Sequence, residues 1–277
     1  MMTTVMQSST NLFRRRRVFP FFFTLVYVSA TDLSWDLMWR PKEARRASCA
    51  LNFFGLVKQF DVILPSIQKH LLDTNPTCDV YAHTYNVSHT TNPRNREHNE
   101  DIYPNDVFKL TANVIMDTDK MFHTTHNVTF YRAFFPPKKS GWHYPTSMDN
   151  MIKQWHSIER AWGRMQSAEE AVGVRYKRVG FFRLDTLFTT PIDVNDGDAV
   201  IPNFGMYPMN DRMFYGTREH AEVWATARFP SVASYLKHHS YIRSENYIKW
   251  LMKAIPVTLK PICFHRVRAH GTIKNDC

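Results

Sequence analysis

Residues 178–188 read Arg-Val-Gly-Phe-Phe-Arg-Leu-Asp-Thr-Leu-Phe. The run is apolar and too short for a typical helix, and Arg183 and Asp185 stand near its end. A short, nearly continuous run of Val, Phe and Leu predicts a buried strand of a parallel sheet. Ligands of open α/β sheets bind beyond the carboxyl ends of the strands, so we expect Arg183 and Asp185 to lie at a ligand site.

A second segment further along the chain has the same arrangement. Residues 210–212 (Asn-Asp-Arg) lead directly into residues 213–216 (Met-Phe-Tyr-Gly). The aromatic part predicts a strand, and the polar triplet places charged side chains at its edge. We expect the chemistry of the protein in these two segments.

The first part of the body predicts a β-α-β unit. Residues 47–54 and 79–85 are short apolar runs typical of buried strands, and residues 60–72 carry apolar side chains at helical spacing. This order indicates an α/β fold in which residues 46–277 form one domain, with a mixed, mainly parallel sheet flanked by helices. The nine glycines never occur as G-x-G, which excludes a glycine-rich dinucleotide site and a P-loop.

The remaining elements follow from the same patterns. Residues 146–173 predict the longest helix, because Met and Trp recur at steps of three and four residues. This stripe is typical of core packing, whereas Gln154 and His156 lie off it and could face a cleft. Further strands are expected at residues 107–110, 199–203 and 255–262, helices at 218–227 and from Ser244 onward, and loops at 86–105 and 120–145.

Residues 117–119 read Asp-Thr-Asp, a literal D-x-D triplet. The triplet follows a weakly apolar segment and precedes Lys120, and so short a motif often matches by chance. We therefore expect a solvated turn here, with a metal site as the alternative.

The N-terminal segment, residues 1–45, has the layout of a targeting signal. Four arginines at 14–17 precede thirteen uncharged residues at 18–30, which end in a small-residue Val-Ser-Ala sequence. A basic flank before a short apolar run is typical of a secretory signal or a signal anchor, and an anchor would leave the body in the lumen. We expect a protein of the Golgi or ER lumen, either secreted or a single-pass type II membrane protein.

The net charge of +10 is unevenly distributed. Residues 1–46 hold eight Lys/Arg and three Asp/Glu, whereas the remaining 231 residues hold 27 and 22. Half of the excess lies in the N-terminal sixth, and the body is only mildly basic. This distribution suits a small phosphate-bearing ligand and argues against nucleic acid as a partner.

Two further features agree with a lumenal body. Asn86 and Asn127 each begin an N-x-[ST] triplet, the acceptor for N-glycosylation. The four cysteines have no CxxC spacing, which argues against a structural zinc site. Cys49 and Cys78 can form a disulfide if their strands are neighbours, and free buried thiols are the alternative.

Several motifs taken together resemble one group of proteins. This group is the GT-A-like glycosyltransferases akin to lipopolysaccharide-synthesis transferases and their uncharacterised eukaryotic relatives. The resemblance covers roughly residues 47–265 and implies a GT-A-like sheet, a nucleotide-sugar donor and usually a divalent cation, Mn²⁺ or Mg²⁺. The matching segments are residues 53–55 (Phe-Phe-Gly), 79–84 (Asp-Val-Tyr-Ala-His-Thr), the long helix with Gln154, 183–185 (Arg-Leu-Asp), 210–216 and 244–246 (Ser-Glu-Asn).

The resemblance implies a donor site with a metal ion. Arg183, Asp185 and Arg212 would contact the donor, and Asp185 would bind the metal with a late histidine, His265 or His270. A metal held by carboxylate oxygens stabilises a leaving diphosphate. This chain has Arg-Leu-Asp where Asp-x-Asp is usual, so one carboxylate is missing, and Arg183 could itself offset the diphosphate charge.

The resemblance also implies catalytic acids. Asp211 and Glu245 are the candidates for the base that deprotonates the acceptor hydroxyl, or for acceptor contacts. The leading interpretation is a nucleotide-sugar-dependent glycosyltransferase that acts on a glycan or glycoconjugate acceptor. The incomplete acidic pair favours the alternative, a catalytically silent GT-A-like protein that binds sugars or nucleotides or serves in assembly.

Overall fold

The computed structural model describes residues 48–137 and 141–277. The chain from Ala44 to Cys277 belongs to one unit. The predicted targeting segment at residues 1–45 lies outside the described residues. Among the described helices, none combines the length and the apolar character that crossing a membrane requires.

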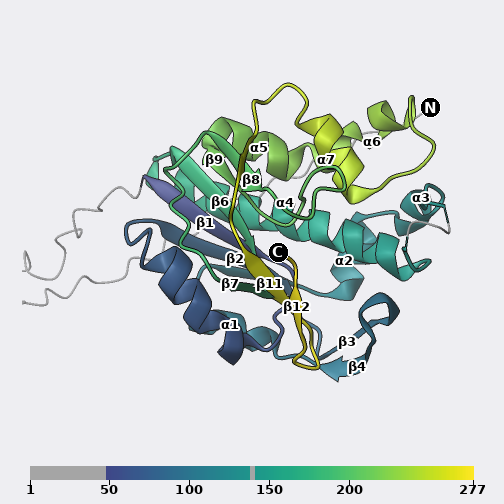
Figure 1. Cartoon of the computed structure of the whole chain (residues 1–277), viewed down its shortest axis with the longest axis horizontal. Coiled ribbons are helices and arrows are strands. Elements are labelled where there is room, and N and C mark those ends of the chain that lie inside the picture. The colour runs from purple at the N-terminus through teal and green to yellow at the C-terminus, as the bar shows by residue number, and fades with distance from the viewer. Residues whose placement is uncertain (1–47, 138–140) are drawn as a thin grey trace, which may run out of the picture. The chain divides into compact units, whose positions relative to one another are not determined.

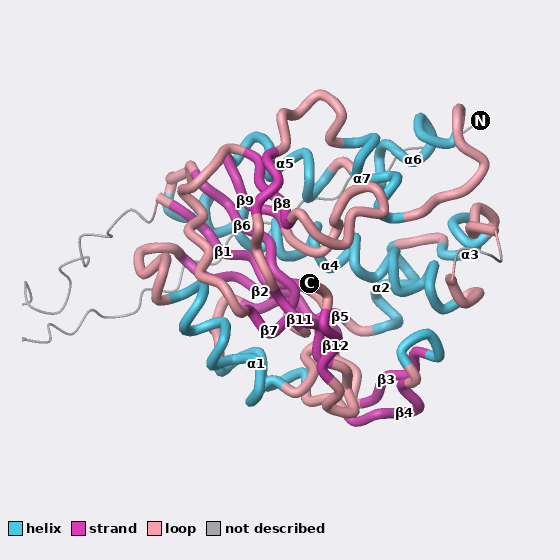
Figure 2. The backbone as a smooth tube through the Cα atoms, in the orientation of Figure 1, coloured by secondary structure: helices cyan, strands magenta, loops and turns pink. Residues whose placement is uncertain are grey.

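A seven-stranded sheet lies at the centre of the fold (Figures 1 and 2). Its strands, in chain order, are β1 (Cys49–Phe54), β2 (Asp79–Tyr85), β5 (Val114–Asp117), β6 (Arg178–Arg183), β8 (Ala199–Pro202), β9 (Phe214–Thr217) and β10 (Thr258–Lys260). Their order in the sheet is β10-β8-β9-β6-β1-β2-β5. The four strands β6, β1, β2 and β5 are parallel to one another, and β9 is antiparallel to β6 and β8. The predicted mixed, mainly parallel sheet is therefore present.

Helices cover both faces of this sheet. They are α1 (Phe60–Ile67), α2 (Asp119–Thr125), α3 (Val128–Arg132), α4 (Thr146–Val172), α5 (Arg218–Thr226), α6 (Arg228–Leu236) and α7 (Ser244–Leu251). Tighter turns are η2 (Gln68–Leu72), η3 (Pro93–Asn95) and η4 (Pro104–Lys109). Figure 1 shows α1 below the sheet, and α4, α5 and α7 above it.

Alternation along β1 explains how one strand serves both faces. All six residues of β1 are buried, as expected for a central parallel strand. Leu51 and Phe53 pack in the cluster with α1, whereas Ala50 and Phe54 pack in the cluster with α4 and α5. The helix α4 buries the predicted Met and Trp stripe and ends at Gly173, whose φ of 67° suits glycine in a left-handed cap.

Two smaller sheets complete the fold. Strands β7 (Thr186–Phe188), β11 (Phe264–Val267) and β12 (Ile273–Asn275) form an antiparallel sheet in which β11, yellow in Figure 1, lies between β7 and β12. Strands β3 (His89–Asn92) and β4 (Glu97–Asp101) form a hairpin.

Two disulfides staple these parts, and together they use all four cysteines. Cys49 at the start of β1 is bonded to Cys78, just before β2, so of the two alternatives for these cysteines the disulfide is present. Cys263, just before β11, is bonded to Cys277 and fixes the C-terminus against that strand.

Four sequence predictions differ from the structure. Residues 107–110 are not a strand but belong mostly to η4, where only Val107 is buried. The expected loop at 86–105 contains the β3–β4 hairpin, and the expected loop at 120–145 contains most of α2 and all of α3. These segments lack a long apolar period because their buried residues contact distant parts of the chain. The strand at 255–262 is shortened to β10.

Candidate functional site

A cavity of about 550 Å³ lies beyond the carboxyl ends of the parallel strands. Gly55, Val87 and Asp185, which follow β1, β2 and β6 respectively, line it. The chain runs from β1 to β2 on one side and returns later to β6 on the other, so the strand order reverses at β1. A crevice at such a switch point is the usual ligand site of an open α/β sheet.

Five of the seven residues proposed from the sequence line this one cavity. They are Arg183, Asp185, Asp211, Arg212 and Glu245. His265 and His270 are not part of the lining. The motifs therefore bring together the donor and acid candidates, whereas the two candidate metal-binding histidines lie apart from them.

Asp185 forms a closed ion pair with Arg183. Both carboxylate oxygens accept hydrogen bonds from the guanidinium, each at 2.7 Å, and Arg183 Nη1 also donates to Gln154 Oε1 at 2.7 Å. Burial alone would raise the pKa of the Asp185 carboxyl, but the charge and hydrogen bonds of Arg183, together with the charges of Lys58 and Arg266, hold that pKa well below its usual range. The Asp185 side chain is thus ionised and fully engaged.

This geometry does not fit a divalent cation at Asp185. The two oxygens that would bind it are held by a guanidinium, and the other nearby charges that lower the carboxyl pKa, on Lys58 and Arg266, are also positive. A cation here would have to displace Arg183 and would face further cations. Arg183, in turn, is not free to offset a diphosphate, because it is bound to Asp185.

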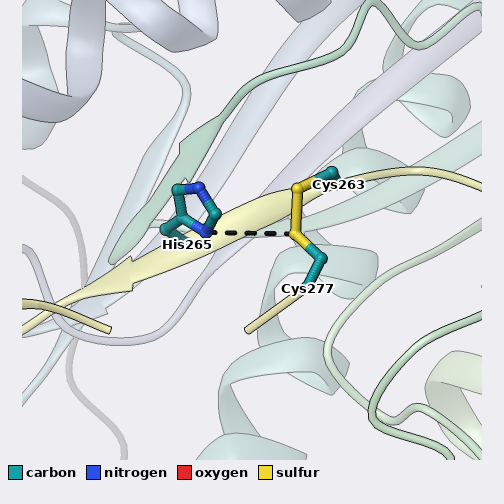
Figure 3. Close-up of side chains that lie close together, drawn as sticks. All are labelled: Cys263, His265 and Cys277. Atoms are coloured by element: carbon teal, nitrogen blue, oxygen red, sulfur yellow. Dashed lines mark hydrogen bonds between the residues drawn. A yellow bond between two sulfur atoms is a disulfide. The ribbon is translucent and has the colours of Figure 1, made fainter. Parts of the chain in front are cut away.

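The two histidines have other neighbours. His265 Nδ1 lies 3.9 Å from Cys277 Sγ, beside the disulfide to Cys263 (Figure 3). Those three side chains have the residue types of a metal site, but both sulfurs are bonded to each other, so neither is a thiolate ligand. His270 is exposed, and its Nε2 contacts the backbone oxygen of Asn95 at 3.4 Å.

Asp211 and Glu245 form the acidic part of the cavity. The Ser244 hydroxyl donates a short hydrogen bond to Asp211 Oδ2, and Gln154 Nε2 donates to the Asp211 backbone oxygen at 3.1 Å. Glu245 Oε2 has no hydrogen-bond partner among the described residues and lies 3.5 Å from Arg243 Nε. Burial raises the pKa of the Glu245 carboxyl, and the charge of Asp211 raises it further. A carboxyl with a raised pKa and an unused oxygen suits proton transfer near neutral pH.

Basic side chains dominate the rest of the lining. Among the described residues, the side chains of Arg94, Arg268 and Lys274 form no hydrogen bond or ion pair with protein groups. The lining holds eight Lys or Arg residues against four Asp or Glu residues. The eight are Lys58, Arg94, Lys153, Arg183, Arg212, Arg266, Arg268 and Lys274.

A buried glutamate, Glu97, positions two of these cations. Its Oε1 accepts from Lys58 Nζ at 2.7 Å and from the backbone N–H of Ala269 at 2.8 Å. This ties the β3–β4 hairpin, which carries Arg94, to the turn after β11, which carries Arg268. Sequence reasoning missed Glu97 because it lies in a polar segment with no apolar period.

A second cluster of polar side chains surrounds Asp117 at the end of β5. Asp117 is 2% exposed, so the expected solvated turn is wrong for this residue. Asp117 Oδ2 lies 2.9 Å from His156 Nε2, 2.9 Å from Arg160 Nε and 3.3 Å from His83 Nε2. The off-stripe residue His156 therefore faces this cluster rather than the cavity.

The cluster continues outward from both histidines. His156 Nδ1 is hydrogen-bonded to His126 Nε2 at 2.9 Å, and His83 Nδ1 to Ser157 Oγ at 2.7 Å. Burial lowers the pKa of His83 and of His156. Burial, and then His156, lower the pKa of His126 to about 4. All three imidazoles are therefore neutral near pH 7.

Two chemical interpretations of this cluster can be compared with its burial. Ser157, His83 and Asp117 have the residue types of an acyl-transfer triad, but all three are buried and Ser157 Oγ already accepts from the Gly55 N–H at 2.8 Å. No substrate carbonyl can reach that oxygen. His83, Asp117 and His156 offer ligand atoms within 4.8 Å of one another and could hold a metal ion. His156 Nε2 is hydrogen-bonded to Asp117 Oδ2, whereas His83 Nε2 lies 3.3 Å from the same oxygen and has no hydrogen-bond partner among the described residues.

Comparisons with known proteins identify no family. No family model matches the sequence. No curated protein matches it either. Among solved structures, the chain is weakly similar to mouse xyloside xylosyltransferase 1 in its apo form, with a TM-score of 0.36 and 11% sequence identity. The alignment covers 76% of this chain and 85% of that chain.

Proposed function

We propose that the protein is a glycosyltransferase that moves a sugar from a nucleotide-sugar donor to a glycan or glycoconjugate acceptor. The observation that carries the proposal is the set of side chains that line the cavity beyond the parallel strands. It combines an excess of basic side chains with Glu245, an acid whose pKa is raised and whose Oε2 is unused. Transfer from a sugar nucleotide needs both, a cationic surface for the leaving diphosphate and a base for the acceptor.

In the proposed reaction the acceptor hydroxyl attacks the anomeric carbon of the donor sugar. The bond from that carbon to the diphosphate oxygen breaks, and its electron pair leaves with the diphosphate. Glu245 takes the proton of the attacking hydroxyl. The Ser244 hydroxyl donates a hydrogen bond to Asp211, and the charge of Asp211 adds to the burial that raises the pKa of Glu245. The Arg183–Gln154 contact helps to position Asp211, since Gln154 also donates to the Asp211 backbone oxygen.

We place this reaction in the secretory pathway, with residues 1–45 as the signal or anchor. Two disulfides that use every cysteine support this placement, because disulfides persist in oxidising compartments. Asn86 and Asn127 of the two sequons are exposed and open to glycosylation. Secretion of the full chain with a mass shift that a glycosidase removes would test the placement.

The decisive variant is Glu245→Gln, measured with a panel of nucleotide sugars for transfer and for donor hydrolysis. Loss of the base lowers kcat by about a hundredfold to ten-thousandfold. Thermal unfolding stays close to that of the unmodified protein, because Glu245 Oε2 makes no hydrogen bond to lose. Glu170→Gln, an exposed position on α4, is the matched control and keeps full activity. Equal turnover in both variants would remove Glu245 from the mechanism.

One observation favours a second candidate, a catalytically silent sugar- or nucleotide-binding protein. The Arg183–Asp185 pair occupies the position at which the resemblance implies a donor-binding acid with a free carboxylate. In that case nucleotides would raise the unfolding temperature of the full chain, while no donor of the panel would be turned over.

A further inference from the structure

We propose, building on the proposed function, that this protein binds the donor diphosphate with Arg94, Arg268 and Lys274 and without a metal ion. The first step is the state of Asp185. Its two oxygens are held by Arg183 at 2.7 Å each, so the acid that would anchor a metal is neutralised inside the protein. The diphosphate charge must be met by other groups.

The charge of the cavity wall is of the right sign to bind a diphosphate. Eight basic side chains line the cavity together with four carboxylates. Glu97 and Asp276, outside the lining, pair with Lys58 and Arg266. Arg243, also outside the lining, pairs with Glu245. Nine cations against six carboxylates leave an excess of three positive charges, more than the two negative charges of a diphosphate esterified at both ends.

The excess is concentrated on three side chains that have no protein partner. Arg94 lies in η3 of the β3–β4 hairpin, Arg268 follows β11, and Lys274 lies on β12. Among the described residues none of the three forms a hydrogen bond or ion pair through its side chain. Arginines in this state offer two parallel N–H groups to a phosphate, and lysine adds a point charge.

The three cations are held in place by groups beneath them. Glu97 ties the hairpin to the turn after β11 through the backbone N–H of Ala269. Asp276 forms a two-fold hydrogen bond to Arg266, at 2.7 Å for each nitrogen, and keeps β12 against β11. The disulfide between Cys263 and Cys277 closes this C-terminal element. The site is therefore preorganised by buried pairs that are themselves already neutral.

The test uses the full chain, stripped of metal over a chelating resin, because a soluble chelator is itself a polyanion. Inorganic pyrophosphate is titrated by calorimetry with and without added Mn²⁺. We expect binding in the absence of metal. Arg94→Gln and Arg268→Gln should each raise Kd by about tenfold to a hundredfold, the size of a lost hydrogen bond to a charged group. Arg96→Gln, on the same hairpin but outside the lining, is the matched control and leaves Kd unchanged.

The variants are suited to this test because Arg94 is exposed and its side chain stabilises nothing else. Pyrophosphate binding that appears only with Mn²⁺ would overturn the inference, and so would equal Kd values for Arg94→Gln, Arg268→Gln and Arg96→Gln. Transfer activity that disappears on stripping and returns with Mn²⁺ would overturn the inference while the proposed function stands. Metal-free pyrophosphate binding without turnover of any donor would support the cationic site and reject the transferase.

Discussion

The cavity and the cluster around Asp117 use the same kinds of side chain in opposite ways. Asp117 is contacted by His83, His156 and Arg160, and the cluster is sealed from solvent except at its outer members. Glu245, in the cavity, is also largely buried, yet its Oε2 has no hydrogen-bond partner among the described residues. The cavity lies beyond the carboxyl ends of the parallel strands, and Asp117 is the last residue of one of them, β5. The difference is that the acid of the cluster, Asp117, is hydrogen-bonded by protein side chains, whereas Glu245 Oε2 in the cavity has no hydrogen-bond partner in the described part of the chain.

This contrast separates structural acids from candidate functional ones better than burial or motif does. Asp117 belongs to a literal D-x-D triplet, and Asp185 occupies a strand end that the resemblance marks as a donor site. Both are neutralised by protein cations. Among the described residues of the cavity, Glu245 Oε2 has no hydrogen-bond partner, and the side chains of Arg94 and Arg268 form neither a hydrogen bond nor an ion pair. Ligand chemistry is therefore expected where charges are unpaired, since satisfied groups have nothing to offer a substrate.

Glu97→Gln gives the largest expected effect and tests a residue that belongs to both categories. Glu97 is buried like Asp117, but it holds in place the part of the cavity lining that carries Arg94 and Arg268. The variant leaves Lys58, 5% exposed, as an unpaired buried charge, and breaking such a pair costs about 3–5 kcal/mol of unfolding free energy. Denaturant unfolding measures this loss.

The matched control is Glu100→Gln, on the same strand but without an ion pair among the described residues, for which we expect a change below about 0.5 kcal/mol. The double variant Lys58→Met with Glu97→Gln removes both charges and should recover part of the loss. Metal-free pyrophosphate affinity should fall in the single variant. An unchanged pyrophosphate affinity would show that Glu97 does not position Arg94 and Arg268.

Much of the fold could be predicted because its signals are local. Residues 179–182 and 80–82 are apolar runs inside two of the strands, and the stripe on α4 repeats at helical spacing and stops at Gly173. Such patterns depend on burial of whole elements, which each segment shows by itself. The β3–β4 hairpin was missed because its polar residues give no period.

The site was predicted only as far as its motifs reached. Asp211 and Glu245 were found because each lies in one of the short motifs that carry the resemblance, residues 210–216 and 244–246. The pairing of Arg183 with Asp185 was open to sequence reasoning, since residues two apart near a strand end point to the same side. The partners of Asp117 could not be found, because His83 and His156 come from distant elements that only the fold brings together.

Asp117→Asn is expected to lower the unfolding free energy by an intermediate amount, and it tests the buried cluster in this comparison. The amide keeps the shape but has one oxygen and adds N–H groups that face two imidazoles and a guanidinium. We expect a loss of about 2 kcal/mol, less than for Glu97→Gln because the Arg160 side chain is 41% exposed and can be solvated. Metal-free pyrophosphate affinity per folded molecule should not change.

Asp119→Asn, in the same triplet, is the control for stability. Asp119 is half exposed and pairs with Lys153 at 2.8 Å on the surface, so its loss should cost less than about 0.5 kcal/mol. Zn²⁺ or Mn²⁺ that stabilises the unmodified chain but not Asp117→Asn would show that the cluster holds a metal. Equal losses of unfolding free energy in Asp117→Asn and Asp119→Asn would contradict the division into buried, hydrogen-bonded acids and acids that are exposed or lack a hydrogen-bond partner.

The smallest expected effect is a pH dependence of the unfolding free energy that arises from His126, in the cluster around Asp117. The folded-state pKa of His126 is lowered to about 4, against about 6.5 for an unperturbed histidine. The unfolded chain therefore binds more protons between these values, and stability falls as pH drops from about 6.5 toward 4. Above about 6.5 the contribution is complete. The Asp117 carboxyl, whose pKa is also lowered, adds its loss only below the ordinary range of an aspartate.

The contribution of His126 can be separated from that of Asp117 by measuring the unfolding free energy at intervals from pH 7.5 to 4, above the range in which Asp117 contributes. The measurement is made on the unmodified chain and on His126→Asn. Asparagine can still donate to His156 but does not titrate, so the slope between about pH 6.5 and 4.5 should become shallower. His123→Asn, an exposed neighbour on α2, should leave the slope unchanged. Because His126 is partly exposed, solvent keeps the difference well under 1 kcal/mol. Identical slopes in all three proteins would mean that His126 is protonated as readily in the folded protein as in the unfolded chain. The cluster would then not differ from the cavity in the way proposed.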